Sequence, residues 1–249
     1  MNHDSSIKVA SGPRPVFHQS WRRIVFLHWE VPVDALAPLI PAGLELDTYH
    51  GRAYIGLVPF TMARVRPAGF PSLPWISYFH ETNVRTYVRR PGHDPGVWFF
   101  SLDAANPIGA ALGRRAFGLP YHWAAMELRE SEREGIRSLE FRSHRRTGLG
   151  REARCLVDTE IDLREPSRRA EPGSLEEFLI ERYLLFSMRR GRCFAGRVRH
   201  APYSIRDARV LALEESLIAA IGIDKRSVPA LAHAVEDVDV DVIPLISAD

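Results

Sequence analysis

The chain contains almost no lysine. Of its 33 basic residues, only Lys8 and Lys225 are lysine, and the rest are arginine. Enzymes that form a Schiff base with a ketone need a buried amine. We expect Lys8 in a loose N-terminal arm and Lys225 in a loop near the C-terminus, with neither side chain buried. The sequence therefore does not favour a mechanism that needs a buried amine.

Long apolar runs, cysteine clusters and metal-binding motifs are also missing. No apolar run approaches the roughly 18 residues of a membrane-spanning helix, and the start MNHDSSIKVASGPRP lacks the apolar core of a signal peptide. Two cysteines, Cys155 and Cys193, exclude a disulfide scaffold and a four-cysteine zinc site. His-Glu-x-x-His, Cys-x-x-Cys, Gly-x-Ser-x-Gly and glycine-rich phosphate loops do not occur. We expect a cytoplasmic protein with no membrane span, no metal and no cofactor, and serine hydrolysis has no support.

The charges are nearly balanced, with 33 basic and 31 acidic residues and a formal net charge of +2. Basic clusters, such as the arginines at 142–151, are interrupted by acidic residues or glycines. Nucleic-acid-binding domains carry a basic patch or stripe. The sequence therefore predicts no nucleic-acid partner.

The chain length of 249 residues suits one large domain. We expect residues 1–15 to form a flexible arm and residues 16–249 to form a single domain. Aromatic and β-branched runs predict strands at 21–31, 44–47, 53–66, 76–88, 97–102, 121–130, 138–145, 193–200 and 238–246. Helices are predicted at 32–43, at 106–117 and, after a capping box, at 174–188, with a short strand and helix over 208–221. This order predicts an α+β domain whose large antiparallel sheet curls into an open barrel with a few peripheral helices.

A row of polar residues follows one face of the strand predicted at 76–88. Side chains of a strand alternate between its two faces, so one face carries Glu81, Asn83, Arg85 and Tyr87. An acid, an amide, a base and a phenol in one row suit the wall of a cavity that holds a carboxylate or a carbonyl. The alternative is a solvated outer face with a cross-strand ion pair.

A second candidate lies where the helix predicted at 106–117 ends. Gly118 stops the helix and Pro120 forces an extended chain, which directs Tyr121 and His122 toward the neighbouring strand. Because histidine titrates near neutral pH, His122 is a candidate general acid–base. A structural role is the alternative for His122. Arg197 and Arg199 form a weaker candidate for binding an anion.

Four separated segments resemble the DUF2071 (YqjF-like) family: HETNVRTYV at 80–88, GVWFFSLD at 96–103, LPYHWA at 119–124 and ERYLLFS at 181–187. The stretch 191–202 is similar too, and the resemblance spans roughly residues 16–246. The fold of this family is grouped with that of acetoacetate decarboxylase. The resemblance therefore implies a cone-like antiparallel β-barrel with helices outside and a ligand cavity inside.

The sequence differs from the decarboxylase motif at the positions of its two lysines. The decarboxylase motif reads approximately Gly-Arg-Glu-x-x-Gly-Phe-Pro-Lys-Lys, and here 113–115 and 118–120 are similar whereas Tyr121 and His122 replace the lysines. Neither side chain can form an iminium with a ketone, so the Schiff-base reaction is not implied. Arg114 matches the arginine of the motif, and Glu81 resembles a glutamate of the decarboxylase pocket.

We therefore predict a bacterial protein that binds a small carbonyl or carboxylate metabolite, such as a keto acid, in its barrel. If it is an enzyme, we expect cofactor-free enolisation, hydration or lyase chemistry, with the catalytic residues His122, Glu81 and Tyr121. The predicted binding residues are Asn83, Arg85, Tyr87 and Arg114. The alternatives are a non-catalytic binding or sensor protein, and an oligomeric scaffold whose contact is the apolar loop 70–79 around Trp75.

Overall fold

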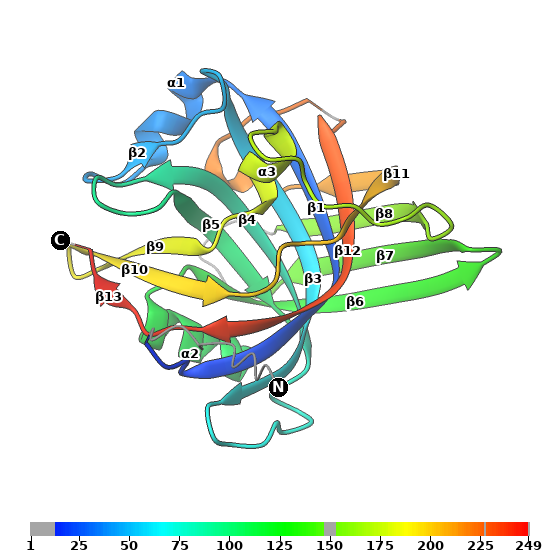
Figure 1. The fold of residues 1–249 in the computed structure, drawn as a ribbon, viewed down its shortest axis with the longest axis horizontal. Coiled ribbons are helices and arrows are strands. Elements are labelled where there is room, and N and C mark those ends of the chain that lie inside the picture. The colour runs from blue at the N-terminus through cyan, green and yellow to red at the C-terminus, as the bar shows by residue number, and fades with distance from the viewer. Residues whose placement is uncertain (1–12, 147–152, 227, 249) are drawn as a thin grey trace, which may run out of the picture.

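One branched sheet forms the body of the protein, which a computed structural model describes over residues 13–146, 153–226 and 228–248 (Figure 1). Residues 1–12 of the predicted arm lie outside the described residues. The strands are β1 (Phe17–Val31), β2 (Glu45–Leu46), β3 (Ala53–Pro67), β4 (Phe79–Arg89), β5 (Gly96–Ala104), β6 (Tyr121–Arg133), β7 (Ile136–Arg145), β8 (Arg154–Asp162), β9 (Leu184–Arg189), β10 (Arg192–Arg199), β11 (Ile205–Glu215), β12 (Leu231–Val242) and β13 (Ile246–Ser247). The helices are α1 (Val33–Leu36), α2 (Pro107–Phe117) and α3 (Leu175–Ile180), with 3-10 turns η1 (Ala37–Leu39) and η2 (Ala219–Ile221).

Nine of these strands close into a barrel. Their order is β5-β6-β7-β8-β11-β12-β1-β3-β4, and β4 pairs with β5 to complete the ring. Most neighbours are antiparallel, but β5 runs parallel to both β6 and β9. Parallel neighbours need a crossover connection, and α2 provides it between β5 and β6. The predicted α+β barrel is confirmed, but it is closed rather than open, and its sheet is mixed rather than wholly antiparallel.

The sheet branches at β12. The first part of β12 pairs with β11, and its last residues pair with β10, which leads through β9 back to β5. Figure 1 shows β9 and β10 on one side of β1, β3 and β12, and β6, β7 and β8 on the other side. The central strands therefore have protein against both of their faces.

Both faces of the central strands carry apolar side chains. On β1, Leu27 and Trp29 belong to a first core that includes residues of β7 and β8. The alternate residues Ile24 and Phe26 belong to a second core that includes residues of β3, β4 and α3. A strand that is buried on both faces has a continuous apolar sequence, as the segment 24–27 does. The candidate site lies on the side of the second core.

The helix predicted from Ser174 is shorter than expected. It spans Leu175–Ile180 instead of reaching 188, and Leu184–Arg189 forms β9. Leu184 and Phe186 both belong to one buried cluster. The prediction was wrong because a short apolar run fits the period of a strand as well as that of a helix. In the capping box, Ser174 Oγ accepts from the Glu177 amide at 3.2 Å, but the Glu177 carboxylate accepts from the Gly173 amide.

Most of the other predicted strands are confirmed with ends that move by a few residues, but the strand predicted at 238–246 is replaced by the end of β12 (Leu231–Val242) and the separate short β13 (Ile246–Ser247). The strand β8 has no counterpart among the predicted ones; it pairs with β7 and β11 and buries alternate side chains from Cys155 to Ile161. Among the described residues, no helix is long and apolar enough to cross a membrane.

Candidate functional site

A cavity of about 190 Å³ lies next to α2, between β1, β3, β4, β5, β9 and β10. Its wall is mostly apolar, with aromatic rings from Phe17, Trp21, Phe26, Phe60 and Phe99. The polar side chains among the lining residues are Gln19, Glu81, Asn83, Arg85, Tyr121, Arg182 and Tyr203. Three of the four members of the predicted polar row therefore line the cavity.

The strand β4 places this row by alternation. Its partners on β3 are Phe60 opposite Glu81 and Gly56 opposite Arg85. The intervening residue Val84 packs into the first core, so the odd-numbered side chains must face the second. Glu81 is 2% exposed and Arg85 is 8% exposed. The alternative of a solvated outer face is therefore excluded.

Glu81 and Tyr121 meet at one end of the row. The Tyr121 hydroxyl donates a hydrogen bond to Glu81 Oε2 at 3.1 Å. Burial raises the pKa of Glu81 to about 8, although this hydrogen bond acts in the opposite direction. Burial, and then the carboxylate of Glu81, raise the pKa of the Tyr121 phenol. Glu81 is therefore mostly protonated at neutral pH and can exchange a proton there.

The helix α2 leaves room for the Tyr121 ring. A Cβ atom added at Gly113 would lie 2.5 Å from two carbon atoms of that ring. Asn106 caps the helix by accepting from the amides of Ile108 and Gly109, each at 3.0 Å. The close approach of α2 at Gly113 thus fixes the position of Tyr121 against Glu81.

Arg85 lies at the other end of the row without a counter-charge. Its Nη2 donates to the carbonyl oxygen of Leu179 at 2.9 Å, and its guanidinium carbon lies 5.3 Å from the centre of the Phe26 ring. Its buried Nε has no hydrogen-bond partner. Among the residues that the structure describes, no carboxylate forms an ion pair with Arg85. A buried charge is costly unless it is paired, so an anion in the cavity would be stabilised here.

The other polar groups of the cavity differ in whether they have an ion-pair or hydrogen-bond partner. Arg182 is paired with Asp47 at 2.9 Å and lies 4.2 Å from the Phe178 ring. The buried Oδ1 atom of Asn83 has no partner. Asn83 therefore has an acceptor available between Glu81 and Arg85, whereas the charge of Arg182 is already balanced.

Two predicted binding residues hold the backbone instead of lining the cavity. The Tyr87 hydroxyl donates to the Leu179 carbonyl oxygen at 2.8 Å, the same atom that accepts from Arg85. Arg114 is exposed and donates to the carbonyl oxygen of Tyr121 at 2.8 Å. Neither is among the residues that line the cavity. Their contacts position Arg85 and Tyr121.

His122 does not join Glu81 and Tyr121. It follows Tyr121 on β6 and is directly opposite Asp103 of β5, while Tyr121 is opposite the cavity residue Leu102. Alternation therefore directs His122 to the face that carries the ion pair of Asp103 with Arg145, at 2.7 Å. Of the three predicted catalytic residues, only Glu81 and Tyr121 come together. The geometry gives no support to the proton transfer predicted for His122.

The buried histidine His28 is absent from the sequence predictions. It lies opposite Gly56, and a Cβ atom at Gly56 would be 3.1 Å from His28 Cδ2 and 3.5 Å from Arg85 Cγ. Both of its ring nitrogens lack a hydrogen-bond partner. Burial, and then the charge of Arg85, lower the pKa of His28 well below its usual value, so it is neutral. A histidine inside the apolar run 24–29 is the sequence signal that could have identified it.

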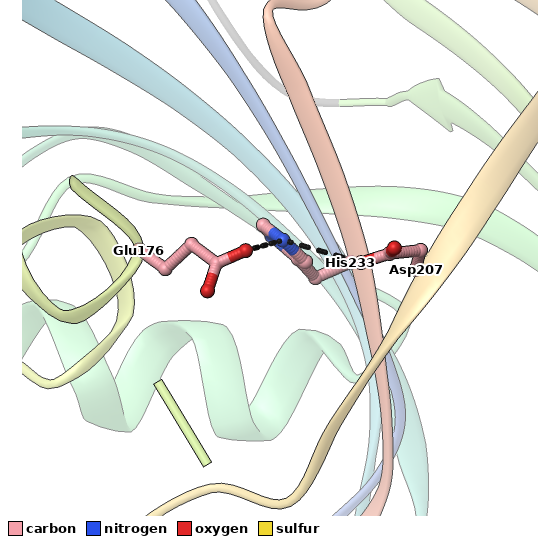
Figure 2. A group of neighbouring side chains, drawn as sticks. All are labelled: Glu176, Asp207 and His233. Carbon is pink, nitrogen blue, oxygen red and sulfur yellow. Dashed lines mark hydrogen bonds and ion pairs between the residues drawn. The ribbon is translucent and has the colours of Figure 1, made fainter. Parts of the chain in front are cut away.

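A second polar cluster anchors α3 (Figure 2). His233 Nε2 lies 3.0 Å from Glu176 Oε1 and 3.7 Å from Asp207 Oδ1. These ligand types could hold a metal ion, but the Arg168 guanidinium already binds both carboxylates, at 2.5 Å and 3.0 Å. We therefore assign this cluster to attaching α3, which supplies the Leu179 carbonyl oxygen, to β11 and β12.

The position of Lys225 corrects one prediction. Its side chain is only 12% exposed, with Nζ 3.2 Å from Glu215 Oε1 and 4.3 Å from the centre of the Trp29 ring. Lys225 is therefore largely buried, contrary to expectation, because a short segment after η2 packs its amine against the first core. That core lies on the other face of β1, and no lysine is among the described residues that line the cavity.

The remaining candidates lie on the surface. Arg197 is paired with Asp94 at 2.5 Å, so its charge is balanced. In the loop 68–78, Trp75 is 90% exposed, and Phe70 and Leu73 are exposed too. These side chains form an exposed apolar surface, and the predicted oligomer stays a prediction.

The comparisons with known proteins agree on both family and fold. The family model of DUF2071, described as an uncharacterized conserved protein, matches residues 18–239. The chain is 33% identical over 236 residues to the uncharacterized protein YqjF of Bacillus subtilis (strain 168), covering 92% of this chain and 91% of YqjF.

Solved structures show the same fold at low sequence identity. The enduracididine biosynthesis enzyme MppR complexed with pyruvate superposes with a TM-score of 0.60 at 14% identity, over 97% of this chain and 93% of MppR. An acetoacetate decarboxylase-like enzyme from Sphingomonas wittichii RW1 gives 0.60 at 12% identity, over 94% and 93% of the two chains. The barrel is therefore of the acetoacetate decarboxylase-like type, and the chain belongs to the DUF2071 family.

Proposed function

We propose that this protein binds a small carboxylate that also carries a carbonyl or hydroxyl oxygen, in the cavity that β9, β10 and α2 close against the central strands. The observation that carries the proposal is the burial of the Arg85 guanidinium without an ion pair to any described acid. A ligand carboxylate at Arg85 supplies the missing charge and a hydrogen-bond acceptor. The neutral oxygen of the ligand binds at Glu81, which donates its proton while Tyr121 holds the other carboxyl oxygen.

The structural relatives support this class of ligand. MppR has the same fold and is described as complexed with pyruvate, a keto acid. The present cavity lacks a lysine among its described lining residues, so we propose binding and proton transfer without an iminium. Glu81 then acts as a base when ionised, by removing a proton from the carbon next to the ligand carbonyl. Tyr121 stabilises the enolate oxygen that forms.

The role of Arg85 is tested by titration calorimetry with a panel of oxo and hydroxy monocarboxylates. The substitution Arg85→Gln is expected to weaken binding about ten- to a hundred-fold, because a hydrogen bond to a charged group contributes roughly 1.5–3 kcal/mol. Arg89→Gln is the matched control, since Arg89 is on the same strand and is exposed beside Glu45. Equal binding by the parent and by Arg85→Gln would refute the proposal.

Catalysis is distinguished from binding alone by hydrogen–deuterium exchange. Enolisation replaces the hydrogens next to the ligand carbonyl by deuterium in D2O, which NMR measures directly. The exchange rate is expected to rise with pH toward a plateau above about pH 8, because the base form of Glu81 grows as its carboxyl ionises. Glu81→Gln is expected to slow exchange by about a hundred-fold or more, and Glu45→Gln on the exposed β2 is the control.

The same experiment has a second readout. The hydrogen bond from Tyr121 lowers the pKa of Glu81, so Tyr121→Phe is expected to move the inflection of the exchange rate to higher pH. Binding without any enzyme-dependent exchange would instead establish a non-catalytic binding or sensor protein, the alternative reading of this cavity.

A further inference from the structure

The two polar ends of the cavity are far apart. Glu81 and Arg85 are four residues apart on β4, which places their Cα atoms about 13 Å from each other at the usual rise of a strand. Their side chains are held toward different elements. Glu81 binds Tyr121 of β6, and Arg85 binds the Leu179 carbonyl oxygen of α3.

This separation restricts the ligand. In an acid such as pyruvate, the carbonyl is bonded directly to the carboxylate, so its two polar groups cannot reach Arg85 and Glu81 together. A ligand that satisfies both needs a carbon chain between its carboxylate and its carbonyl or hydroxyl group.

The space between the two ends suits such a chain. A cavity needs about 10–15 Å³ to hold one water, so about 190 Å³ corresponds to roughly 13–19 water-sized atoms. Pyruvate, with six non-hydrogen atoms, would fill roughly a third to a half of that space. The walls between the polar ends are apolar, with Val58 and Phe60 on β3 and Leu102 on β5.

We infer that the cavity is specific for longer oxo or hydroxy monocarboxylates, in which several carbon atoms separate the carboxylate at Arg85 from an oxygen at Glu81 and Tyr121. The inference rests on the proposed function and adds the position of the second oxygen. Asn83, whose Oδ1 has no partner, lies between the two ends and can accept from a hydroxyl group on the chain.

The test compares isomers of equal size. Binding of 2-oxooctanoate and 7-oxooctanoate is measured by calorimetry, with octanoate as the ligand that lacks a carbonyl. The 7-oxo isomer is expected to bind about ten-fold more tightly than the 2-oxo isomer, because only it reaches Glu81 while its carboxylate is at Arg85. Since the isomers share their composition, ligand size does not account for the difference.

Variants locate the two ends. Glu81→Leu is expected to remove the preference for the 7-oxo isomer and to leave octanoate binding unchanged, whereas Arg85→Gln weakens all three acids. Tyr121→Phe, which keeps the ring beside Gly113, is expected to reduce the preference and serves if Glu81→Leu does not fold. If 2-oxooctanoate binds as tightly as its isomer in an Arg85-dependent manner, the inference is wrong and the proposed function stands. If no acid depends on Arg85, both are wrong.

Discussion

Glu81→Gln is expected to stabilise the protein at alkaline pH. The carboxyl has a folded-state pKa of about 8 because it is buried, against a reference value of 4.5. Between these values the unfolded chain has released the proton and the folded protein has kept it, so the stability of the parent falls as pH rises, by about 1.4 kcal/mol per pH unit. Glutamine cannot ionise, and it retains an oxygen that can accept from Tyr121.

The expected measurement is therefore a difference that grows with pH. Relative to the parent, the variant gains about 3–4 kcal/mol in unfolding free energy between about pH 5 and pH 8, and little more above the folded pKa. Urea unfolding followed by circular dichroism at several pH values gives this quantity. Glu45→Gln, at an exposed position of β2, should show no such growth. A constant difference for Glu81→Gln would mean that Glu81 is ionised in the folded protein.

The second large effect concerns the ion pair of Asp103 and Arg145. Asp103 is fully buried, and its carboxylate accepts from Arg145 Nε at 3.0 Å and from Arg145 Nη2 at 2.7 Å. The pair connects β5 to β7 across β6. Removing one partner from a buried pair costs about 3–5 kcal/mol, because the other charge is left without compensation.

The two single substitutions should differ. Asp103→Asn leaves a guanidinium that cannot lose its proton, and we expect it to lower the unfolding free energy by about 3–5 kcal/mol. Arg145→Met leaves a carboxyl whose pKa burial already raises, so its cost should decrease as pH falls. The double variant should lose less than the sum of the two. The exposed pair of Arg52 and Glu30 is the control, with an expected cost below about 1 kcal/mol.

Much of the candidate site could be predicted from short stretches of sequence. Alternation on the strand at 79–89 groups Glu81, Asn83 and Arg85 on one face, because the side-chain period of a strand is a local property. The end of α2 follows from Gly118, which adopts a left-handed conformation with φ of 66°. The resemblance to DUF2071 supplied the barrel, which propensity alone would not have distinguished from an open sheet.

These local sequence rules gave a wrong prediction where one sequence pattern is compatible with two different structures. The apolar run at 184–188 fits a helix or a strand, and only its pairing with β10 and β5 makes it a strand. His122 was chosen for the chemistry of its side chain, but its direction depends on the register of β6 against β5. Burial of Lys225 depends on packing against Trp29, a residue almost two hundred positions earlier in the sequence.

By itself, the sequence determined which residues share a strand face, where the main helix ends, and that lysine is nearly absent. The tertiary structure alone decided that the polar row faces a cavity, that Tyr121 meets Glu81, and that Arg85 has no acid beside it. The physical reason is that both faces of β4 are buried. Alternation therefore assigns residues to two faces but does not show which face borders the cavity. Contacts such as that of Tyr121 with Glu81 join positions 40 residues apart and form only when barrel closure brings their strands together.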